Sequence, residues 1–296
     1  MTAAENCGMK ISTALDAFIL AETVNAHAVF DTGNLTTMAA SGVPITLSST
    51  TVPQMVTRTE AVLRSNNVSM VDTVFVLDPF ALSDIAQFPI GKDITSENTV
   101  FKNGFKGSIY GSKVYSSNNL TGEATLVYTG NSVATEALTI AGITFTAVTT
   151  IGSTAGNFLS SDSDSTTAVT NLAGILNDPS TTSANQVALS AADQATLSAL
   201  NITATATSST VLTIVAKGSG RLVLTEAQTN ATWATNFIHA YFGMTGAIDV
   251  VIQEEIDLLE TQEPKQRTKN YMLDIVAGIK TFLDGTQKFL DVKINS

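Results

Sequence analysis

Residues 237–296 read FIHAYFGMTGAIDVVIQEEIDLLETQEPKQRTKNYMLDIVAGIKTFLDGTQKFLDVKINS, and the rest of the chain is organised around this stretch. Its first strand-like run places Ile248, Val250 and Ile252 on one face, which predicts a half-buried strand. Its second run has Asp274 and Lys280 on the opposite face, which predicts one buried side and a strand of unusual length. The apolar face of this second run consists of Tyr271, Leu273, Ile275, Ala277 and Ile279.

The segment that follows, Leu283 to Thr286, reads LDGT and predicts a tight turn, because Asp-Gly tolerates the positive backbone angles of a short hairpin. Leu290, Val292 and Ile294 are then expected to return beside the second run. A tail of this length is too short to supply a whole sheet, so its other pairing partners must come from earlier in the chain.

The first 120 residues mix helices and strands. A helix is expected over 10–28, with Ser12 as its cap, Asp16 near the positive end of its dipole, and one buried stripe. That stripe consists of Ile11, Leu15, Phe18 and Ile19. Residues 31–51, rich in Gly, Ser and Thr, predict a long loop or an irregular strand pair.

A second helix is expected after Pro53, ending at Asn66 and Asn67, which tolerate left-handed backbone geometry. A short strand over 73–77 then leads into a third helix, which Asp78 caps and Pro79 begins. Two short strands about Gly111 complete this part of the chain.

From residue 121 to about 231 the composition shifts to Thr, Ser and Ala, with few charges. Ala141-Gly142 lies between alternating apolar runs and predicts a hairpin. We expect two helices, over 169–177 and 190–200, and three more strands, over 202–207, 211–217 and 222–225. The block resembles an inserted domain, because the segments on either side look incomplete alone and complete together. The sequence thus predicts an α+β protein with a two-part core, 1–120 and 233–296, and an α+β insertion domain, 121–232.

Composition restricts the classes of function and the cellular compartment that the sequence predicts. The 296 residues carry a formal net charge of −11, which argues against tight wrapping around nucleic acid but leaves loose enclosure of DNA open. The single cysteine, Cys7, fits a reducing compartment, and the chain lacks both a membrane-spanning run and a secretion signal, so we expect synthesis in a cytoplasm. Only 14% of the residues are charged, which hints that neighbours cover much of the surface.

Catalytic chemistry finds little support. The two histidines, His27 and His239, do not make a metal site, and structural roles are expected for both. A Cys-His pair would need Cys7 to meet one of them across the fold. No nucleophile elbow, phosphate-binding loop or dinucleotide fingerprint occurs, so neither an enzyme nor a cofactor is expected.

A charged run remains in the tail. Its acids could serve acid/base chemistry or hold a cation, but a solvated or partner-facing edge is the favoured interpretation. Bases follow closely and could meet complementary patches on an identical neighbour. The candidates for a subunit interface are Glu254, Glu255, Asp257, Glu260, Lys265, Arg267 and Lys269, with Glu263 in the same run. Charge reversal at Arg267 is expected to impair assembly and to leave the monomer folded.

The order of these segments resembles the major capsid proteins of tailed bacteriophages. The segments are a strand into Leu77-Asp78-Pro79, then GSIYGSKVYSSNNL from Gly107 to Leu120, then a variable insert, and then Tyr271 with Gly278 and Lys280 near the end. The insert's GITFTAV, residues 142–148, is similar to insertion domains of some coat proteins. The resemblance covers most of the chain outside the insert, through motifs that are individually common.

The resemblance implies a peripheral domain with a long spine helix, for which 10–28 is the candidate, and an axial domain. It implies self-assembly as pentamers and hexamers into an icosahedral shell that encloses double-stranded DNA in a virion assembled in host cytoplasm. Portal, scaffolding and decoration proteins are further implied partners, and no membrane is implied.

Members also carry an N-terminal arm and an extended loop before the spine helix. Either this chain is a processed or partial form, or residues 31–52 replace those elements.

Two rival functions stay open: another surface module, such as a tail or fibre component or an adhesin, and a hydrolase that uses the acidic run.

Overall fold

Strand β12 (Ala231–Met244) is the centre of the main sheet in the computed structural model, which describes residues 3–70, 72–87, 105–109, 112–160, 165–218, 220–262 and 269–295. Along one edge β12 pairs antiparallel first with β5 (Thr121–Tyr128) and then with β2 (Thr73–Leu77). Along the other edge it pairs with β15 (Phe289–Asn295). Residues 237–243 are buried throughout, because this half of β12 is covered on both faces.

On the edge of β12 that carries β5 and β2, the sheet continues from β2 to β4 and β3, and from β5 to β10 and β9. Strand β1 joins it through a parallel pairing with β15. A second sheet has the order β11, β6, β7, β8. The bounds of these strands are β1 (Ala28–Phe30), β3 (Phe105–Ile109), β4 (Ser112–Ser116), β6 (Ala137–Ile140), β7 (Ile143–Val148), β8 (Asn157–Leu159), β9 (Ile202–Ala206), β10 (Val211–Ala216) and β11 (Leu224–Glu226). The protein is therefore a mixed α+β structure, as predicted.

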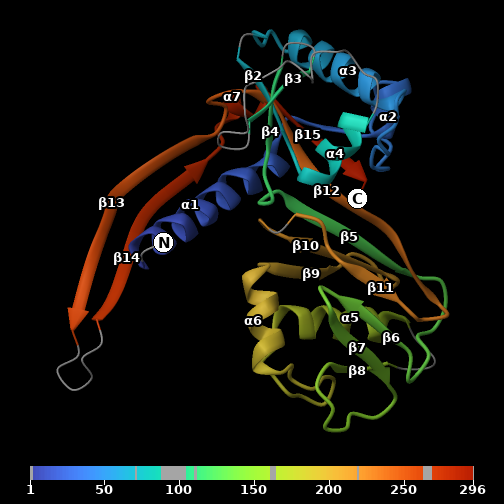
Figure 1. Ribbon diagram of the computed structural model, residues 1–296. Helices are drawn as coiled ribbons and strands as arrows, with labels where there is room; N and C mark the ends of the chain where they lie inside the picture. Colours follow the sequence, from blue (N-terminus) through green and yellow to red (C-terminus); the bar gives the residue numbers. More distant parts are fainter. Residues whose placement is uncertain are drawn as a thin grey trace.

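Buried apolar side chains form two clusters. One contains residues from Leu20 to Leu120 and from Ile238 to Ile294, and the other contains residues from Ala124 to Ala231. Strands β5 and β12 run from one cluster into the other, so the two cores share a sheet (Figure 1). We call residues 121–232 the block, and we interpret the second cluster as its core. That the block is an inserted domain stays a prediction.

Most helices form where local signals place them. Helix α3 (Thr51–Ser65) buries Val52, Met55, Thr59 and Leu63, and it ends at Asn66, with Asn67 at a φ of 61°. Helix α4 (Pro79–Gln87) follows Asp78, whose carboxylate accepts the backbone N–H of Ala81 at 3.0 Å. In the block, α5 (Ser165–Asn177) and α6 (Ala191–Ala199) lie within a few residues of the predicted ranges.

The predicted hairpin at Ala141-Gly142 also forms, between β6 and β7. The two turn residues have φ values of 53° and 80°, as a two-residue hairpin with right-handed strand twist requires.

The first helix differs from expectation. Helix α1 (Ala3–Ala21) begins and ends earlier than 10–28, and a 3₁₀ turn, η1 (Glu22–Asn25), follows it. Ser12 lies inside the helix and does not cap it. The expected buried stripe is wrong: among the side chains of α1 that the structure describes, only Leu20 is buried, and Phe18 is 61% exposed.

Residues 31–51 hold more order than a loop. Asp31 caps the short helix α2 (Thr32–Thr36) and is fully buried, because its carboxylate also accepts the backbone N–H groups of Ser41 and Gly42. Ile45 then forms a single parallel bridge with Ile294 of β15. This segment is therefore fastened to the sheet by backbone hydrogen bonds.

The chain end is the largest correction. Residues Leu283–Thr286 form a helical turn, α7, instead of a hairpin, and β15 does not return beside the preceding strand. Four consecutive residues of β15, 289–292, are buried, so this strand is stable only inside the sheet. The two long runs pair instead with each other, as β13 (Asp249–Gln262) and β14 (Lys269–Lys280), in a two-stranded ribbon.

Candidate subunit interface

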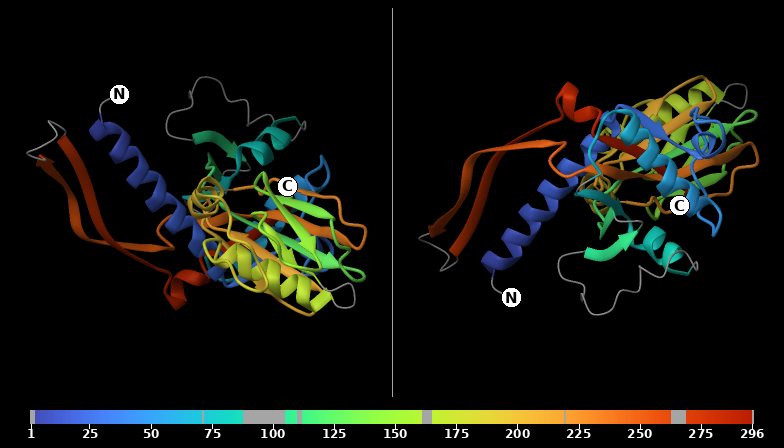
Figure 2. Two further views of the ribbon diagram at one scale, coloured as in Figure 1. Left: turned by 90° about the horizontal axis from the view of Figure 1, so that it is seen from below. Right: turned by 90° about the horizontal axis from the view of Figure 1, so that it is seen from above.

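Helix α1 and the β13–β14 ribbon project together from the body, and we call them the arm. Figure 2 shows the two side by side and extending away from the sheets in both views. The ribbon is a separate two-stranded sheet. A two-stranded ribbon buries little apolar surface by itself, so additional contacts are needed to hold it rigidly.

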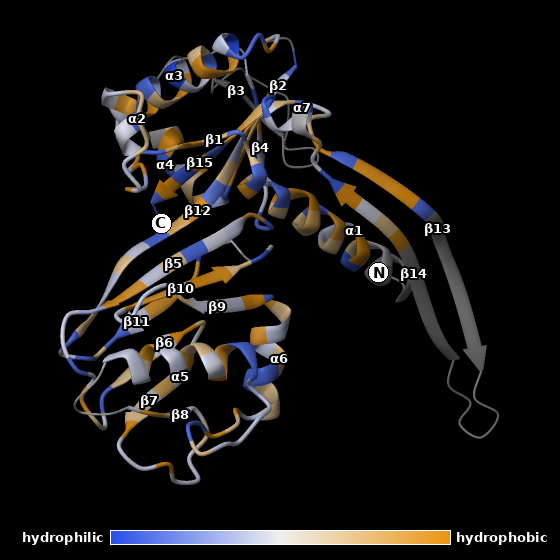
Figure 3. Ribbon diagram, turned by 180° about the vertical axis from the view of Figure 1, so that it is seen from behind, coloured by the Kyte–Doolittle hydropathy of each residue, from blue (hydrophilic) through white to orange (hydrophobic). Residues whose placement is uncertain are grey.

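The arm exposes large apolar side chains. Phe18 is 61% and Val251 65% exposed, and orange apolar segments line α1 and the first part of β13 in Figure 3. The face of β13 that carries Val250 and Ile252 was predicted to be buried, but both side chains are exposed. Further exposed apolar residues on or next to the arm are Met9, Val24, Val276 and Phe282. Exposed apolar side chains that gather on one projecting part of a chain are typical of an interaction site.

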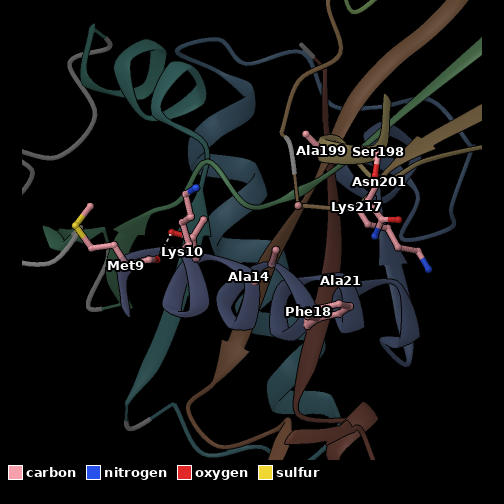
Figure 4. Close-up of a pocket in the computed structure, with 12 residues that line it drawn as sticks. Met9, Lys10, Ala14, Phe18, Ala21, Ser198, Ala199, Asn201 and Lys217 are labelled. Carbon is pink, nitrogen blue, oxygen red and sulfur yellow. Dashed lines mark hydrogen bonds between the residues drawn. The ribbon is translucent and has the colours of Figure 1, made fainter. Parts of the chain in front are cut away.

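A groove runs along α1. On one side a pocket of about 740 Å³ lies between the helix and the turn that follows α6, with Phe18 and Met9 from the helix and Asn201 from the turn (Figure 4). A second pocket of about 590 Å³ lies between α1 and β14, where Ala277 and Ile279 line it. The two pockets share Phe18, Ala14 and Ala21 of the helix together with Asn201 and Lys217, so they adjoin along the same stretch of α1.

Two cations border the groove, Lys10 on α1 and Lys217 after β10. They belong to a protein with a net charge of −11, and the predicted interface residues are mostly acidic. An acidic surface would therefore match the groove in charge as well as offering apolar contact.

Polar contacts anchor the middle and the end of α1 to the body. Asp16 accepts hydrogen bonds from Ser117 Oγ and Asn119 Nδ2, both at 2.8 Å. Glu22 accepts from the Thr281 hydroxyl at 3.1 Å, which ties the helix end to the exit of the ribbon. Asp16 thus has a structural role in the middle of the helix, and the expected role at a helix N-terminus is wrong.

The predicted interface residues gather on the ribbon. The acids lie along β13: Glu254 is opposite Val276, Asp257 is opposite Asp274, and Glu260 is opposite Tyr271. Glu255 lies at an irregularity of the same strand, and Lys269 begins β14 opposite Gln262. Lys265, Arg267 and Glu263 lie outside the described residues. The structure therefore brings the described candidates to one element, distant from both hydrophobic cores.

Sequence reasoning missed a second charged feature, at the seam between the block and the core. His239 on β12 lies between Asp291 of β15 and Glu123 of β5, with ring nitrogens 2.8 Å and 3.2 Å from the carboxylates. Asp78, which follows β2, and Arg221 of the block form a second ion pair between the block and the core, at 2.6 Å. The available signal was a polar residue inside an apolar run, as in FIHAYF and FLDVKI.

Within the described ranges, no group of His, Cys, Asp and Glu side chains has the arrangement of a metal site, and no helix is both long and apolar enough to span a bilayer. The side chain of Cys7 lies outside what the structure describes. A scan against protein-family models finds no match for the chain, and a search of curated proteins finds none with significant similarity.

Proposed function

We propose that this protein is a structural subunit that assembles with copies of itself into a closed shell, as the resemblance to tailed-phage major capsid proteins implies. In this proposal pentamers and hexamers form an icosahedral particle that encloses double-stranded DNA. The core would supply the peripheral and axial domains, with the block as an insertion that projects from the shell or contacts a neighbour.

The observation that supports the proposal is the arm. Its apolar side chains, including Phe18 and Val251, face solvent in the single chain, although burying one such side chain is worth about 1.5–3 kcal/mol. A free monomer gains nothing from holding a helix and a ribbon away from its cores. A neighbouring copy that covers the arm would gain the apolar contact, and symmetry repeats each such contact around the shell.

The charge balance fits enclosure of DNA and does not favour tight binding. A net charge of −11 repels the phosphate backbone, and sequence-independent affinity needs clustered Lys and Arg. An acidic inner surface would let packaged DNA slide and leave. Tight, salt-sensitive binding of duplex DNA by the isolated protein would contradict this part of the proposal.

Sedimentation velocity combined with negative-stain microscopy of the purified chain tests the function. Closed shells of uniform size are the expected product. Fibres would favour the rival interpretation as a tail or fibre component, and a monomer that persists through a wide range of concentration and salt would refute self-assembly. Arg267→Glu should prevent assembly while the circular dichroism spectrum and the unfolding midpoint stay at their wild-type values.

A further inference from the structure

Three charged side chains meet across three neighbouring strands at the seam between block and core. The carboxylate of Asp291 lies 2.8 Å and 3.0 Å from Nδ1 of His239, and Glu123 Oε2 lies 3.2 Å from Nε2 of the same ring. The side chains of His239 and Asp291 are 4% and 2% exposed, whereas that of Glu123 is 23% exposed. The triad is thus closed at the Asp291 end and reaches solvent at the Glu123 end.

Each member belongs to a different part of the chain. Glu123 lies on β5, the first strand of the block, opposite Phe237. His239 lies on β12, opposite Thr121 on one side and Lys293 on the other, where that strand leaves the block and enters the core. Asp291 lies on β15, at the end of the chain. The triad therefore fastens the block to the core in addition to the backbone ladder.

Both ring nitrogens face carboxylates, so both must donate, and only the imidazolium ion can do this. Burial by itself would lower the pKa of His239, but the hydrogen bonds and charges of Asp291 and Glu123 outweigh it and raise that pKa to about 9. Burial by itself would raise the pKa of Glu123, but the contacts with His239 and the charge of Lys293 outweigh burial and lower that pKa. Lys293 is the further charged group that acts at this site, with its amine over the ring of Phe237.

We propose that Glu123, His239 and Asp291 form a pH-sensitive lock, which holds the first strand of the block against the core while the imidazole is protonated and releases that strand when the ring loses its proton. This lock goes beyond the proposed function, since it operates within one chain and does not depend on assembly.

The geometry decides which contact opens. A neutral imidazole has one N–H donor, so one carboxylate must then face a ring lone pair. Asp291 is almost fully buried and cannot reach water, whereas Glu123 is partly exposed. The ring therefore keeps its proton on Nδ1 toward Asp291, and Glu123 turns outward into solvent. Two carboxylates without an intervening cation also repel each other, which favours the same movement.

Local opening of β5 is the direct readout. In hydrogen exchange measured by mass spectrometry, and corrected for the base catalysis of the exchange reaction itself, the opening equilibrium of residues 121–124 should rise about tenfold between pH 7 and pH 10. Proton NMR of the two histidines should show His239 titrating over the same range, with the His27→Gln variant to assign the signals. Protection of β5 that stays constant while His239 titrates would overturn the lock.

Two variants separate the lock from general loosening. Glu123→Gln keeps the size of the side chain and removes the carboxylate charge that is proposed to turn into solvent. Hydrogen exchange of β5 in this variant should therefore not depend on pH across this range. Glu136→Gln removes a carboxylate elsewhere in the block and should keep the wild-type pH response. If both variants lose the pH response of β5 exchange, or if both keep it, the lock does not depend on Glu123.

Discussion

The guanidinium of Arg221 donates to the carboxylate of Asp78, through Nε at 2.6 Å and Nη2 at 3.3 Å. Asp78 directly follows strand β2 and caps α4, whereas Arg221 belongs to the block, 143 positions later. The side chains are 3% and 18% exposed, and the guanidinium lies 5.7 Å from the centre of the Phe80 ring. One bidentate ion pair thus ties the block to a helix of the core.

Removal of Arg221 should destabilise the protein strongly. Arg221→Met leaves the buried Asp78 carboxylate without its cation, and we expect a loss of about 3 kcal/mol in the free energy of unfolding, measured in urea. The double variant Arg221→Met with Asp78→Asn should recover part of this loss, because Asn remains a good helix cap and carries no charge. If the double variant is no more stable than the single one, the buried charge is not the cause.

A methyl group at Gly122 should disrupt the seam. A Cβ built there would lie about 2.0 Å from the backbone oxygen of Gly220, an overlap that no side-chain rotation relieves. Gly122→Ala should therefore cost more than about 3 kcal/mol of stability or prevent folding, by thermal unfolding and soluble yield. Gly278→Ala, also in a strand but with no atom within 4 Å of its Cβ, is the matched control and should fold normally.

A charge on the exposed face of α1 should abolish assembly and spare the fold. For Phe18→Asp we expect an unfolding free energy within about 0.5 kcal/mol of wild type, because the ring is already largely in water. Shells should be missing in negative-stain images. Val223→Asp, at an equally exposed apolar position of the block, is the control that should still assemble, and normal shells from Phe18→Asp would exclude α1 from the interface.

Stability should fall in alkaline solution. Because the pKa of His239 is raised from 6.5 to about 9 by the fold, its contribution is fully present below pH 6.5 and is lost progressively as the pH rises to about 9. Urea unfolding of wild type and of His239→Gln at pH 6.5, 8 and 9.5 measures this. The variant should have the flatter profile, and parallel profiles would mean that another group is responsible.

The sequence by itself determined the elements that rest on short-range chemistry. Asp78 and Pro79 begin α4, Asn66 and Asn67 end α3, and Ala141-Gly142 closes a hairpin, because a cap or a turn needs only a few neighbouring atoms. The α+β class followed from the same patterns. The place of the acidic run was not predicted from the sequence: the alternation ends at Ile252, and only the structure shows that β13 continues through the acids to Gln262.

Only the tertiary structure decided which strands pair and which faces are covered. Alternation in 289–295 says that a strand forms, but its pairing with β12 and β1 depends on a core assembled from residues more than 200 positions apart. The apolar stripe of α1 looks the same in sequence whether the chain itself or a neighbour covers it, and in this chain Phe18 stays exposed. Contacts such as His239 with Glu123, separated by 116 positions, likewise arise from the register of three strands, which no local pattern encodes.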